Sequence, residues 1–556
     1  MSEAFKRRPI PQLTGKGIYN RPAIIHHTYP VGGQDFFRKT LGEVLDIKVT
    51  TDSEDVLLKV SHNISGKMED ISFEKKGPKE FHAKMPLTKC GIFHYRVKYS
   101  FNGRKWHWDR DPSTYFLVAP PVINSVKMYT LIPNASGDFN NWKKYLHHIK
   151  DIGFNVIHLL PITEMGTQKS PYEVHDLFKI DPHYSIKGDP RDTLEQFEDF
   201  MQEAKSLEIG LCIDLVLNHV GVKSRIATNY SDWIIPDSKR PDGLKRAGYW
   251  DNNEWKEWED LVLINYDHPI PTTRKKIWEH MKEYVLFWAN YADYTNGMIR
   301  FDNLHSTNHH FLLFLTHAIN EEFPHLGVFA ELFTDLKKTL DMTKIFKINL
   351  LLSTPWVIPY AEQTRRLLEN NHKFFEKLLY LHPITSHDSP GILQQYGHID
   401  AIIPRYVIAA FLDNGHVGIT QGVEFGYGIK INFVNRVEEI PFLETSPVKD
   451  FCPFFKKANS LIEEYPLFKM GENLKFIDNG HPAVIAGWRF NPENPNEGFI
   501  VMANLDTTGT QTTNLNFTHT KINKNQKVIN LLNGKQEVVQ EKVTLGPCEA
   551  KLLKLY

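Results

Sequence analysis

Acidic, basic and histidine side chains recur in this sequence where short apolar segments end. Four such ends supply the candidate residues: Asp214, Asn218 and His219 in IDLVLNHV, Arg300 and Asp302 in MIRFDN, Glu331 in VFAEL, and His387 and Asp388 in ITSHDS. Arg300 and Asp302 are two residues apart, so both point to the same side of an extended strand. If the four segments are parallel strands of one barrel, their polar ends meet around one pocket.

Three of these carboxylates (Asp302, Glu331 and Asp388), together with the arginine and the two histidines, could cleave an acetal if they share one pocket. That reaction needs an acid that protonates the leaving oxygen and a carboxylate that traps or stabilises the oxocarbenium ion. Because Arg300 lies beside Asp302, we expect its charge to lower the pKa of Asp302 and keep it ionised. The same anionic pocket would raise the pKa of Glu331 and suit it to be the acid. Taken singly, each residue could also be a cap, a salt-bridge partner or a buried histidine.

The elements that would position these residues alternate between strand and helix. Helical spacing of apolar residues is clear in Arg191–Ile209 and Arg274–Tyr291. The strand candidates are Ser125–Ile132, Asn155–Pro161, Leu211–Leu217, Gly297–Asp302, Gly327–Leu332, Ile348–Leu352, His382–Asp388 and Gly415–Gln421. Eight such repeats predict an α/β fold with a (β/α)8 TIM barrel. The turn-rich stretch 220–271 has no clear period, and we expect a loop insertion there.

Both flanks of the barrel are rich in strand patterns. Up to residue 118, β-rich runs separated by polar turns predict an N-terminal all-β sandwich. From residue 471, further β-rich runs and the hairpin signal Asn533-Gly534 predict a C-terminal β-sandwich. We therefore expect three domains: 1–118, the catalytic barrel 119–470, and 471–556.

Composition argues against several classes of protein. The 556 residues carry 65 Lys+Arg and 66 Asp+Glu, a net charge of −1, so nucleic acid is not expected as the main partner. Apolar stretches fall far short of the roughly 20 residues of a membrane-spanning helix, so no membrane partner is expected. The beginning of the sequence lacks the apolar core of a secretory signal, and the four cysteines have no metal-binding spacing. We expect a cytoplasmic protein without a cofactor, and the oligomeric state stays open.

The polar strand ends, taken in order, carry a family resemblance. DLVLNHV, GMIRFDN, VFAEL and SHD resemble the four sequence regions of the α-amylase-type glycoside hydrolases, family 13. SPYEVHDLFKIDPHYS (Ser170–Ser185) resembles the stretch after strand two of that family, and GITQGVEFG, with Gly422 and Glu424, resembles its strand-eight signature. The resemblance covers about residues 155–425 and implies flanking β-domains on both sides of the barrel.

Several segments are similar to one branch of this family. IRFDNLHST, VFAELFTDL, YWDNNEWKEW and IWEHMKEY resemble the glucanotransferase module of eukaryote-type glycogen debranching enzymes. Those enzymes also carry a second, glucosidase half, which these 556 residues do not include. The resemblance therefore implies the module that moves or cleaves α-1,4-linked glucan.

The resemblance also implies roles for individual residues. Asp302 matches the catalytic nucleophile, Glu331 the general acid/base and Asp388 the transition-state stabiliser. Four further positions match groups that hold the nucleophile or the reacting sugar: Arg300, the aromatic Tyr172, His219 and His387.

Other positions carry a weaker or structural implication. Asp214 matches a strand-three carboxylate that is usually structural, and Asn218 matches a calcium ligand of many amylases. The remaining calcium ligands would come from the insertion and cannot be aligned, so we expect no metal and keep calcium as an alternative. Ser386 departs from the Asn that amylases place before His-Asp, which leaves the subtype open. The tryptophans of the insertion could be core residues or glucan platforms: Trp233, Trp250, Trp255 and Trp258.

These features predict a retaining enzyme that works by double displacement, with Asp302 and Glu331 carboxyl groups roughly 5 to 5.5 Å apart. The main prediction is a 4-α-glucanotransferase acting on α-1,4-glucan or maltooligosaccharides. Three alternatives stay open: an α-amylase-like hydrolase, a maltosyltransferase with a sugar-phosphate donor, and a non-catalytic glucan-binding protein.

Overall fold

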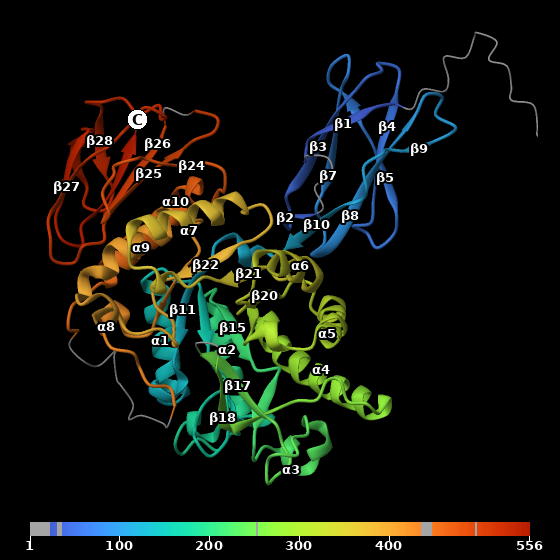
Figure 1. The fold of residues 1–556 in the computed structure, drawn as a ribbon, viewed down its shortest axis with the longest axis vertical. Coiled ribbons are helices and arrows are strands. Elements are labelled where there is room, and N and C mark those ends of the chain that lie inside the picture. The colour runs from blue at the N-terminus through green and yellow to red at the C-terminus, as the bar shows by residue number, and fades with distance from the viewer. Residues whose placement is uncertain (1–22, 31–35, 252–253, 435–446, 495–496, 556) are drawn as a thin grey trace, which may run out of the picture. The chain divides into compact units, whose positions relative to one another are not determined.

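The computed structural model describes residues 23–30, 36–251, 254–434, 447–494 and 497–555, except for the side chains of Trp250 and Asp251. The chain forms two compact units, Met1–Val118 and Ala119–Tyr556 (Figure 1). Each unit has a hydrophobic core of its own.

The first unit is a sandwich of two β-sheets. Along β3 (Val44–Thr51) every second residue is buried, as expected for a strand with one face on a core. The strands of one sheet lie in the order β1 (Ile25–Tyr29), β3, β7 (Glu80–Pro86), β6 (Glu74–Lys75). The strands of the other sheet lie in the order β2 (Phe36–Thr40), β10 (Thr114–Ala119), β8 (Gly91–Ser100), β4 (Leu57–His62), β5 (Glu69–Ser72), and β9 (His107–Trp108) pairs with β8. The predicted N-terminal β-sandwich is confirmed.

The second unit is built around a closed parallel barrel. Its eight strands are β11 (Lys127–Leu131), β12 (Val156–Leu159), β15 (Gly210–Leu215), β19 (Met298–Phe301), β20 (Gly327–Ala330), β21 (Leu350–Leu352), β22 (Tyr380–Pro383) and β23 (Val417–Thr420). β23 pairs with β11, with Ile419 opposite Tyr129, and this pairing closes the barrel. Strands such as β15 are buried along their whole length, which is why they form continuous apolar runs in the sequence. The predicted TIM barrel is confirmed.

Helices connect the barrel strands and cover their outer side (Figure 1). In chain order they are α1 (Phe139–Asp151), α2 (Thr193–Ser206), α4 (Pro271–Tyr294), α5 (His309–Glu322), α6 (Leu336–Phe346), α7 (Ala361–Lys373), α8 (Ile392–Tyr396), α9 (Ile402–Phe411) and α10 (Cys452–Glu464). α2 begins at a capping box between Asp192 and Glu195 and buries Phe197 and Phe200. The strands' carboxyl ends therefore share one face of the barrel.

The insertion after β15 is more regular than the sequence predicts. Instead of a loop, it contains α3 (Arg225–Asn229) and a three-stranded antiparallel sheet of β16 (His219–Gly221), β18 (Glu254–Leu263) and β17 (Arg246–Asp251). The first six residues of β18 are all exposed, and the register shifts between Arg246 and Gly248. Without a buried face, the hairpin has no alternation of apolar and polar residues, so its strands cannot be recognised from the pattern. We call β17 and β18 the insertion hairpin.

The strands after residue 471 form a layer on the barrel within the same compact unit. One sheet has the order β24 (Leu474–Phe476), β25 (Val484–Phe490), β26 (Gly498–Asn504), β31 (Ala550–Leu555), β28 (Lys527–Asn530), β29 (Lys535–Val538), and β27 (Gln511–Asn514) pairs with β30 (Lys542–Leu545). β26 contacts the barrel helix α9. The buried Arg489 donates to the carbonyl oxygens of Asp413 and Met470 at 2.7 and 2.9 Å, which ties this layer to the barrel.

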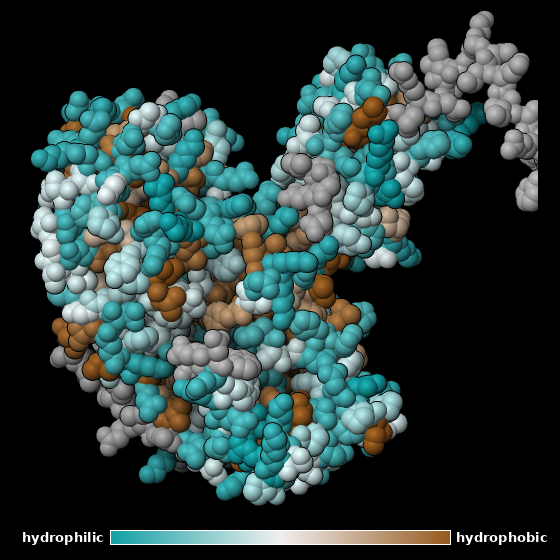
Figure 2. Space-filling view, in the orientation of Figure 1, coloured by the Kyte–Doolittle hydropathy of each residue, from teal (hydrophilic) through white to brown (hydrophobic). Residues whose placement is uncertain are grey.

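Hydrophobic residues on the face shown in Figure 2 are scattered among polar ones. Among the helices of the described ranges, none combines the length and the apolar character that crossing a membrane requires.

Candidate active site

The predicted residues gather at one open cavity of about 1000 Å³. Asp302, Glu331 and Asp388 line it together with Tyr172 and His219. The other described lining residues are Gln168, Ser170, Gly248, Tyr249, Trp255, Trp258, Glu259, Asp260, Leu261, Asn303, His305, Ser306, Phe333, Phe433 and Val434. The pocket is therefore built from the strand ends and from the insertion hairpin.

Backbone hydrogen bonds of the barrel continue for one residue past the strands and place the two central carboxylates. The Asp302 N–H donates to the Leu215 carbonyl at 3.1 Å, and the Glu331 N–H donates to the Phe301 carbonyl at 3.1 Å. Asp302 and Glu331 thus follow directly on the neighbouring strands β19 and β20.

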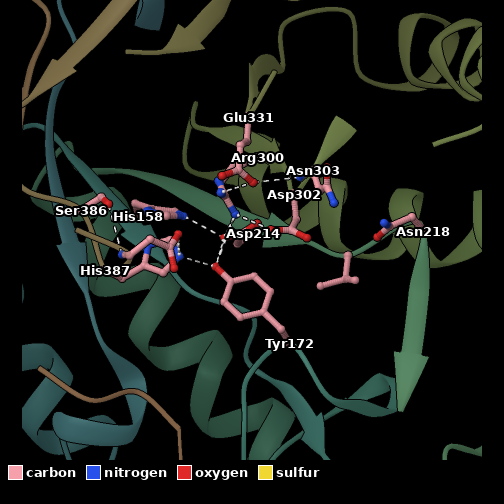
Figure 3. Close-up of polar contacts among 12 residues, drawn as sticks. His158, Tyr172, Asp214, Asn218, Arg300, Asp302, Asn303, Glu331, Ser386 and His387 are labelled. Atoms are coloured by element: carbon pink, nitrogen blue, oxygen red, sulfur yellow. Dashed lines mark hydrogen bonds and ion pairs between the residues drawn. The ribbon is translucent and has the colours of Figure 1, made fainter. Parts of the chain in front are cut away.

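Arg300 is the cation that the carboxylates share (Figure 3). Its side chain is 1% exposed, and its Nη1 lies 2.5 Å from Asp214 Oδ2 and 3.3 Å from Asp302 Oδ1. Its Nη2 lies 3.0 Å from Glu331 Oε2. One guanidinium therefore contacts three acidic side chains.

The structure corrects the predicted direction of the pKa shift of Asp302. We expected Arg300 to lower that pKa, but the pKa of Asp302 is raised well above its ordinary value. Burial is the largest cause, the negative charge of Glu331 adds to it, and the attraction of Arg300 does not outweigh them.

Glu331 receives a second contact that the sequence does not reveal. The backbone N–H of Asn303 donates to Glu331 Oε2 at 3.0 Å. Asn303 has a φ of 44°, in the left-handed region, which Asn tolerates better than most residues. This conformation belongs to the turn after β19. The tolerance of Asn for such a turn was the only signal in the sequence that could have indicated this contact.

Asp214 is completely buried behind the pocket. The Tyr172 hydroxyl donates to its Oδ2 at 2.9 Å, and His158 Nε2 lies 3.2 Å from the same oxygen. Burial alone would raise the pKa of Asp214, but the charge of Arg300 and the contact with His158 keep it below the ordinary value. His158, at the end of β12, was not among the predicted site residues.

Tyr172 contributes both its ring and its hydroxyl group to the contacts around the pocket. Its hydroxyl oxygen lies 2.8 Å from His387 Nε2, and its ring stacks on His387 with centroids 5.7 Å apart. His387 Nε2 also lies 2.9 Å from Asp388 Oδ2. Burial opposes ionisation of Asp388, yet the neighbouring His387 holds the pKa of Asp388 below its ordinary value. Tyr172, His387 and Asp388 are thus connected in one network.

Ser386 occupies the position where the sequence departs from the amylase pattern. Its Oγ accepts from the backbone N–H groups of Asp388 and Ser389, both at 3.1 Å. The serine therefore closes the turn that presents Asp388 to the pocket.

His219 lines the pocket as a neutral imidazole. Its Nδ1 lies 2.8 Å from Asn218 Oδ1, an arrangement that makes Nδ1–H the donor and leaves the Nε2 lone pair as an acceptor. Nε2 is buried and has no hydrogen-bond partner among the described residues. Burial lowers the pKa of His219 to about 4.

Asn218 does not fit a calcium ligand in this arrangement. Its Oδ1, the atom that would bind a cation, is already in contact with His219, and its Nδ2 donates to Ser306 Oγ at 2.9 Å. Within the described ranges, the one group of three or more His, Cys, Asp or Glu side chains whose ligand atoms lie close enough together to share a metal ion is in the first unit.

The lowered pKa of His219 predicts a pH dependence of stability. The unfolded chain binds a proton at this residue as the pH falls through 6.5, whereas the folded protein resists until about 4. Stability should therefore be lost between these pH values, by about 3 kcal/mol from this residue. Urea unfolding at pH 7, 5.5 and 4 should show a smaller loss for His219→Gln than for the wild type. An equal loss in both proteins would contradict the prediction.

Comparisons with known proteins agree with this fold. Residues 121–234 match the family model of the glycogen debranching enzyme glucanotransferase domain. An α-1,4-glucan:maltose-1-phosphate maltosyltransferase of Picrophilus torridus is 26% identical over 72% of this chain and 64% of its own length. A second protein of that name, from Salinibacter ruber, is 24% identical over 68% of this chain and 60% of its own length. The chain thus spans less than two thirds of these relatives.

A solved structure shows the same fold. The maltogenic α-amylase of Thermotoga neapolitana superposes with a TM-score of 0.62 and 18% identity, over 78% of this chain and 99% of that one. The closed eight-stranded barrel, the motif at each strand end and these relatives lead to one conclusion. The chain is similar to the α-amylase-type glycoside hydrolases, family 13, in its fold and, over residues 121–234, in its match to the debranching-enzyme family model.

Proposed function

We propose that the protein is a retaining 4-α-glucanotransferase, which cleaves an α-1,4-glucosidic bond and transfers the released glycosyl segment to another glucan. The observation that carries the proposal is the pair of carboxylates on neighbouring strands, Asp302 and Glu331, both held by Arg300. Such a pair supplies the nucleophile and the proton donor that double displacement needs.

In the first half-reaction, Asp302 attacks the anomeric carbon while Glu331 gives its proton to the departing glycosidic oxygen. The bond to that oxygen breaks, and an ester forms between the sugar and Asp302. In the second half-reaction, Glu331 takes the proton of an acceptor hydroxyl, whose oxygen attacks the anomeric carbon. The ester bond breaks, Asp302 leaves as a carboxylate, and the configuration is retained.

The surrounding side chains suit the sugar that reacts. His219 Nε2 can accept a hydrogen bond from a sugar hydroxyl, because no described protein group occupies it. Asp388, 54% exposed at the pocket, is an ionised acceptor for further hydroxyls. These contacts would orient the ring and would strengthen as the oxocarbenium character develops.

The charge of the pocket favours a neutral glucan as the donor. Five acidic side chains line it, and none of the described lining residues is Lys or Arg. A sugar phosphate would bring a dianion next to these carboxylates, and like charges in one pocket repel each other.

A second candidate function is supported by the relatives rather than by the pocket. Proteins named maltose-1-phosphate maltosyltransferases match over 72% and 68% of this chain, far more than the residues 121–234 of the debranching-enzyme match. Maltosyl transfer from a sugar phosphate uses the same ester on Asp302 and differs only in the group that leaves first.

One incubation distinguishes these functions. Purified protein is given maltopentaose, with and without α-maltosyl phosphate, and chain lengths, reducing ends and free phosphate are followed. Transfer between glucans should give both shorter and longer chains with a constant number of reducing ends. Rising reducing ends would contradict transfer in favour of hydrolysis. Inertness until the phosphate donor is added, with release of phosphate, would establish the second candidate, and inertness throughout would leave a glucan-binding protein.

A further inference from the structure

A completely buried carboxylate lies next to the catalytic pocket without lining it. Glu173 is 0% exposed, and within the described residues neither of its carboxylate oxygens contacts a Lys, Arg or His side chain. Burying such a group is costly unless other groups donate hydrogen bonds to it. The groups that do so belong to the loop between β13 (Thr163–Met165) and β14 (Val174–Ile180).

Glu173 binds this loop through its side chain and through its backbone. Its Oε1 accepts from the N–H of Thr167 at 3.0 Å, and its Oε2 accepts from the N–H of Gln168 at 2.6 Å. The Glu173 carbonyl oxygen accepts from the N–H of Gly166 at 2.7 Å, and the Glu173 N–H donates to the Ser170 carbonyl at 3.0 Å. One residue therefore fixes the loop at several points along its length.

The loop that Glu173 holds forms part of the pocket wall. Three of its residues line the catalytic cavity: Gln168, Ser170 and Tyr172. Tyr172 directly precedes Glu173, and its hydroxyl contacts both Asp214 and His387 (Figure 3). The position of this hydroxyl therefore depends on a segment that Glu173 anchors.

Two glycines leave room for the side chain of Glu173. A Cβ on Gly166 would lie 2.2 Å from both Cδ and Oε1 of Glu173, closer than side chains approach each other. A Cβ on Gly221 would lie 3.1 Å from Glu173 Cγ. Gly221 ends β16, which begins at the pocket residue His219. Two walls of the pocket, the loop and the start of the insertion, thus close around this one carboxylate.

We propose that Glu173 is a positioning residue of the active site, which fixes the loop so that the Tyr172 hydroxyl stays in contact with Asp214. Glu173 does not touch the substrate and acts through Tyr172. A displacement of about 1 Å in such a group can cost on the order of 100-fold in rate. The inference rests on the proposed function only through the ester on Asp302, which both candidate functions form.

The test uses the release of fluoride from α-maltosyl fluoride, with maltose as the acceptor. Glu173→Gln preserves the volume of the side chain, but it replaces one acceptor oxygen by an NH2 group, so one backbone N–H of the loop faces another donor. It should lower kcat/KM about 100-fold, with most of the loss in kcat, because the Tyr172 hydroxyl belongs to the catalytic network. Glu173→Asp keeps a carboxylate and should recover part of kcat.

A glycine substitution reaches the same carboxylate from the other side. Gly166→Ala should lower kcat like Glu173→Gln, because its methyl group would displace the carboxylate. Gly77→Ala is the matched control, since the atom nearest to its Cβ would be Glu80 Cβ at 3.5 Å, an ordinary contact distance. It should leave kcat and KM unchanged.

A double-mutant cycle separates positioning from a general loss of stability. Tyr172→Phe removes the hydroxyl that the loop places, so adding Glu173→Gln to it should lower kcat further by less than about threefold. A general loss of stability would act equally in both backgrounds. Full additivity of the two substitutions, or wild-type kcat in Glu173→Gln, would overturn the inference.

Hydrogen exchange tests the loop independently of the reaction. In Glu173→Gln the N–H groups of Thr167 and Gln168 should exchange at least about tenfold faster than in the wild type, whereas those of the barrel strands should not. Unchanged exchange at these two amides would also overturn the inference. Failure of the wild-type protein to release fluoride would overturn the proposed function instead, and the exchange rates would still show whether Glu173 holds the loop.

Discussion

Asp302→Asn and Glu331→Gln are each expected to lower the turnover of glucan by on the order of 10⁴-fold or more, because each removes a group on which every catalytic cycle depends. An amide at residue 302 cannot form the ester, and an amide at residue 331 cannot give a proton to the leaving oxygen. Both replacements nearly preserve volume, and Asp302 and Glu331 are 13% and 15% exposed, so the fold should persist. Turnover and circular dichroism of the purified variants measure both effects.

A donor with a good leaving group separates the two roles. α-Maltosyl fluoride needs no proton on its leaving group, so Glu331→Gln should still form the ester and should accumulate it, detectable as an added maltosyl mass. Asp302→Asn should not react with the fluoride at all. Asp335→Asn is the matched control, since Asp335 only caps α6 and Asn is an equally good cap. Substantial glucan turnover by either active-site variant would contradict the assignment.

Arg300→Leu is expected to combine loss of activity with a loss of stability of about 3 to 5 kcal/mol at pH 7. The guanidinium is 1% exposed and contacts Asp214, which is completely buried, so its removal leaves a buried carboxylate without a cation. Arg300→Lys keeps a charge but cannot reach three carboxylates at once, and it should lie between the wild type and Arg300→Leu. Urea unfolding curves measure the differences.

The deficit of Arg300→Leu should shrink as the pH falls. In the wild type the pKa of Asp214 is lowered, so its contribution to stability is present above the ordinary carboxyl pKa and is lost in acid. In the variant, Asp214 is buried without a cation beside it, so we expect its pKa to be raised. Protonation of Asp214 at low pH then removes the unpaired buried charge. Asp214→Asn in the Arg300→Leu background should recover part of the stability at pH 7. A deficit that is independent of pH, with no recovery in the double variant, would show that the guanidinium acts through packing alone.

The barrel could be predicted because its strands are buried on both faces. Segments such as Val156–Leu159 and Met298–Phe301 are buried at every position, so they form short, mostly apolar runs in the sequence, and polar residues such as Asp302 and Glu331 directly follow several of the strands. The chemistry-bearing residues sit at those ends, so their types and order were enough to bring Asp302, Glu331 and Asp388 to one pocket. The order of strands and polar residues in the sequence therefore predicts which side chains meet in the pocket.

The charge interactions within the site depend on distances that the sequence does not reveal. The sequence shows that Arg300 is near Asp302, but only the structure shows that Asp214 and Glu331 lie closer to the guanidinium, at 2.5 and 3.0 Å against 3.3 Å. The pKa of Asp302 is raised because burial, the largest cause, and the negative charge of Glu331 together outweigh the attraction of Arg300. The insertion hairpin was missed for a different reason, since its aromatic residues face the pocket rather than a core and leave no period in the sequence.

The contacts of Arg300 also bear on how charge moves during a cycle. When the ester forms, Asp302 loses a negative charge, and Glu331, having given up its proton, gains one. Both oxygens touch the same guanidinium, Asp302 through Nη1 and Glu331 through Nη2. The total charge around Arg300 is therefore the same before and after the step, and only its position shifts from one side of the guanidinium to the other. The pocket can pass from free enzyme to glycosyl-enzyme and back without drawing in a counterion, and little water has to reorient at either step.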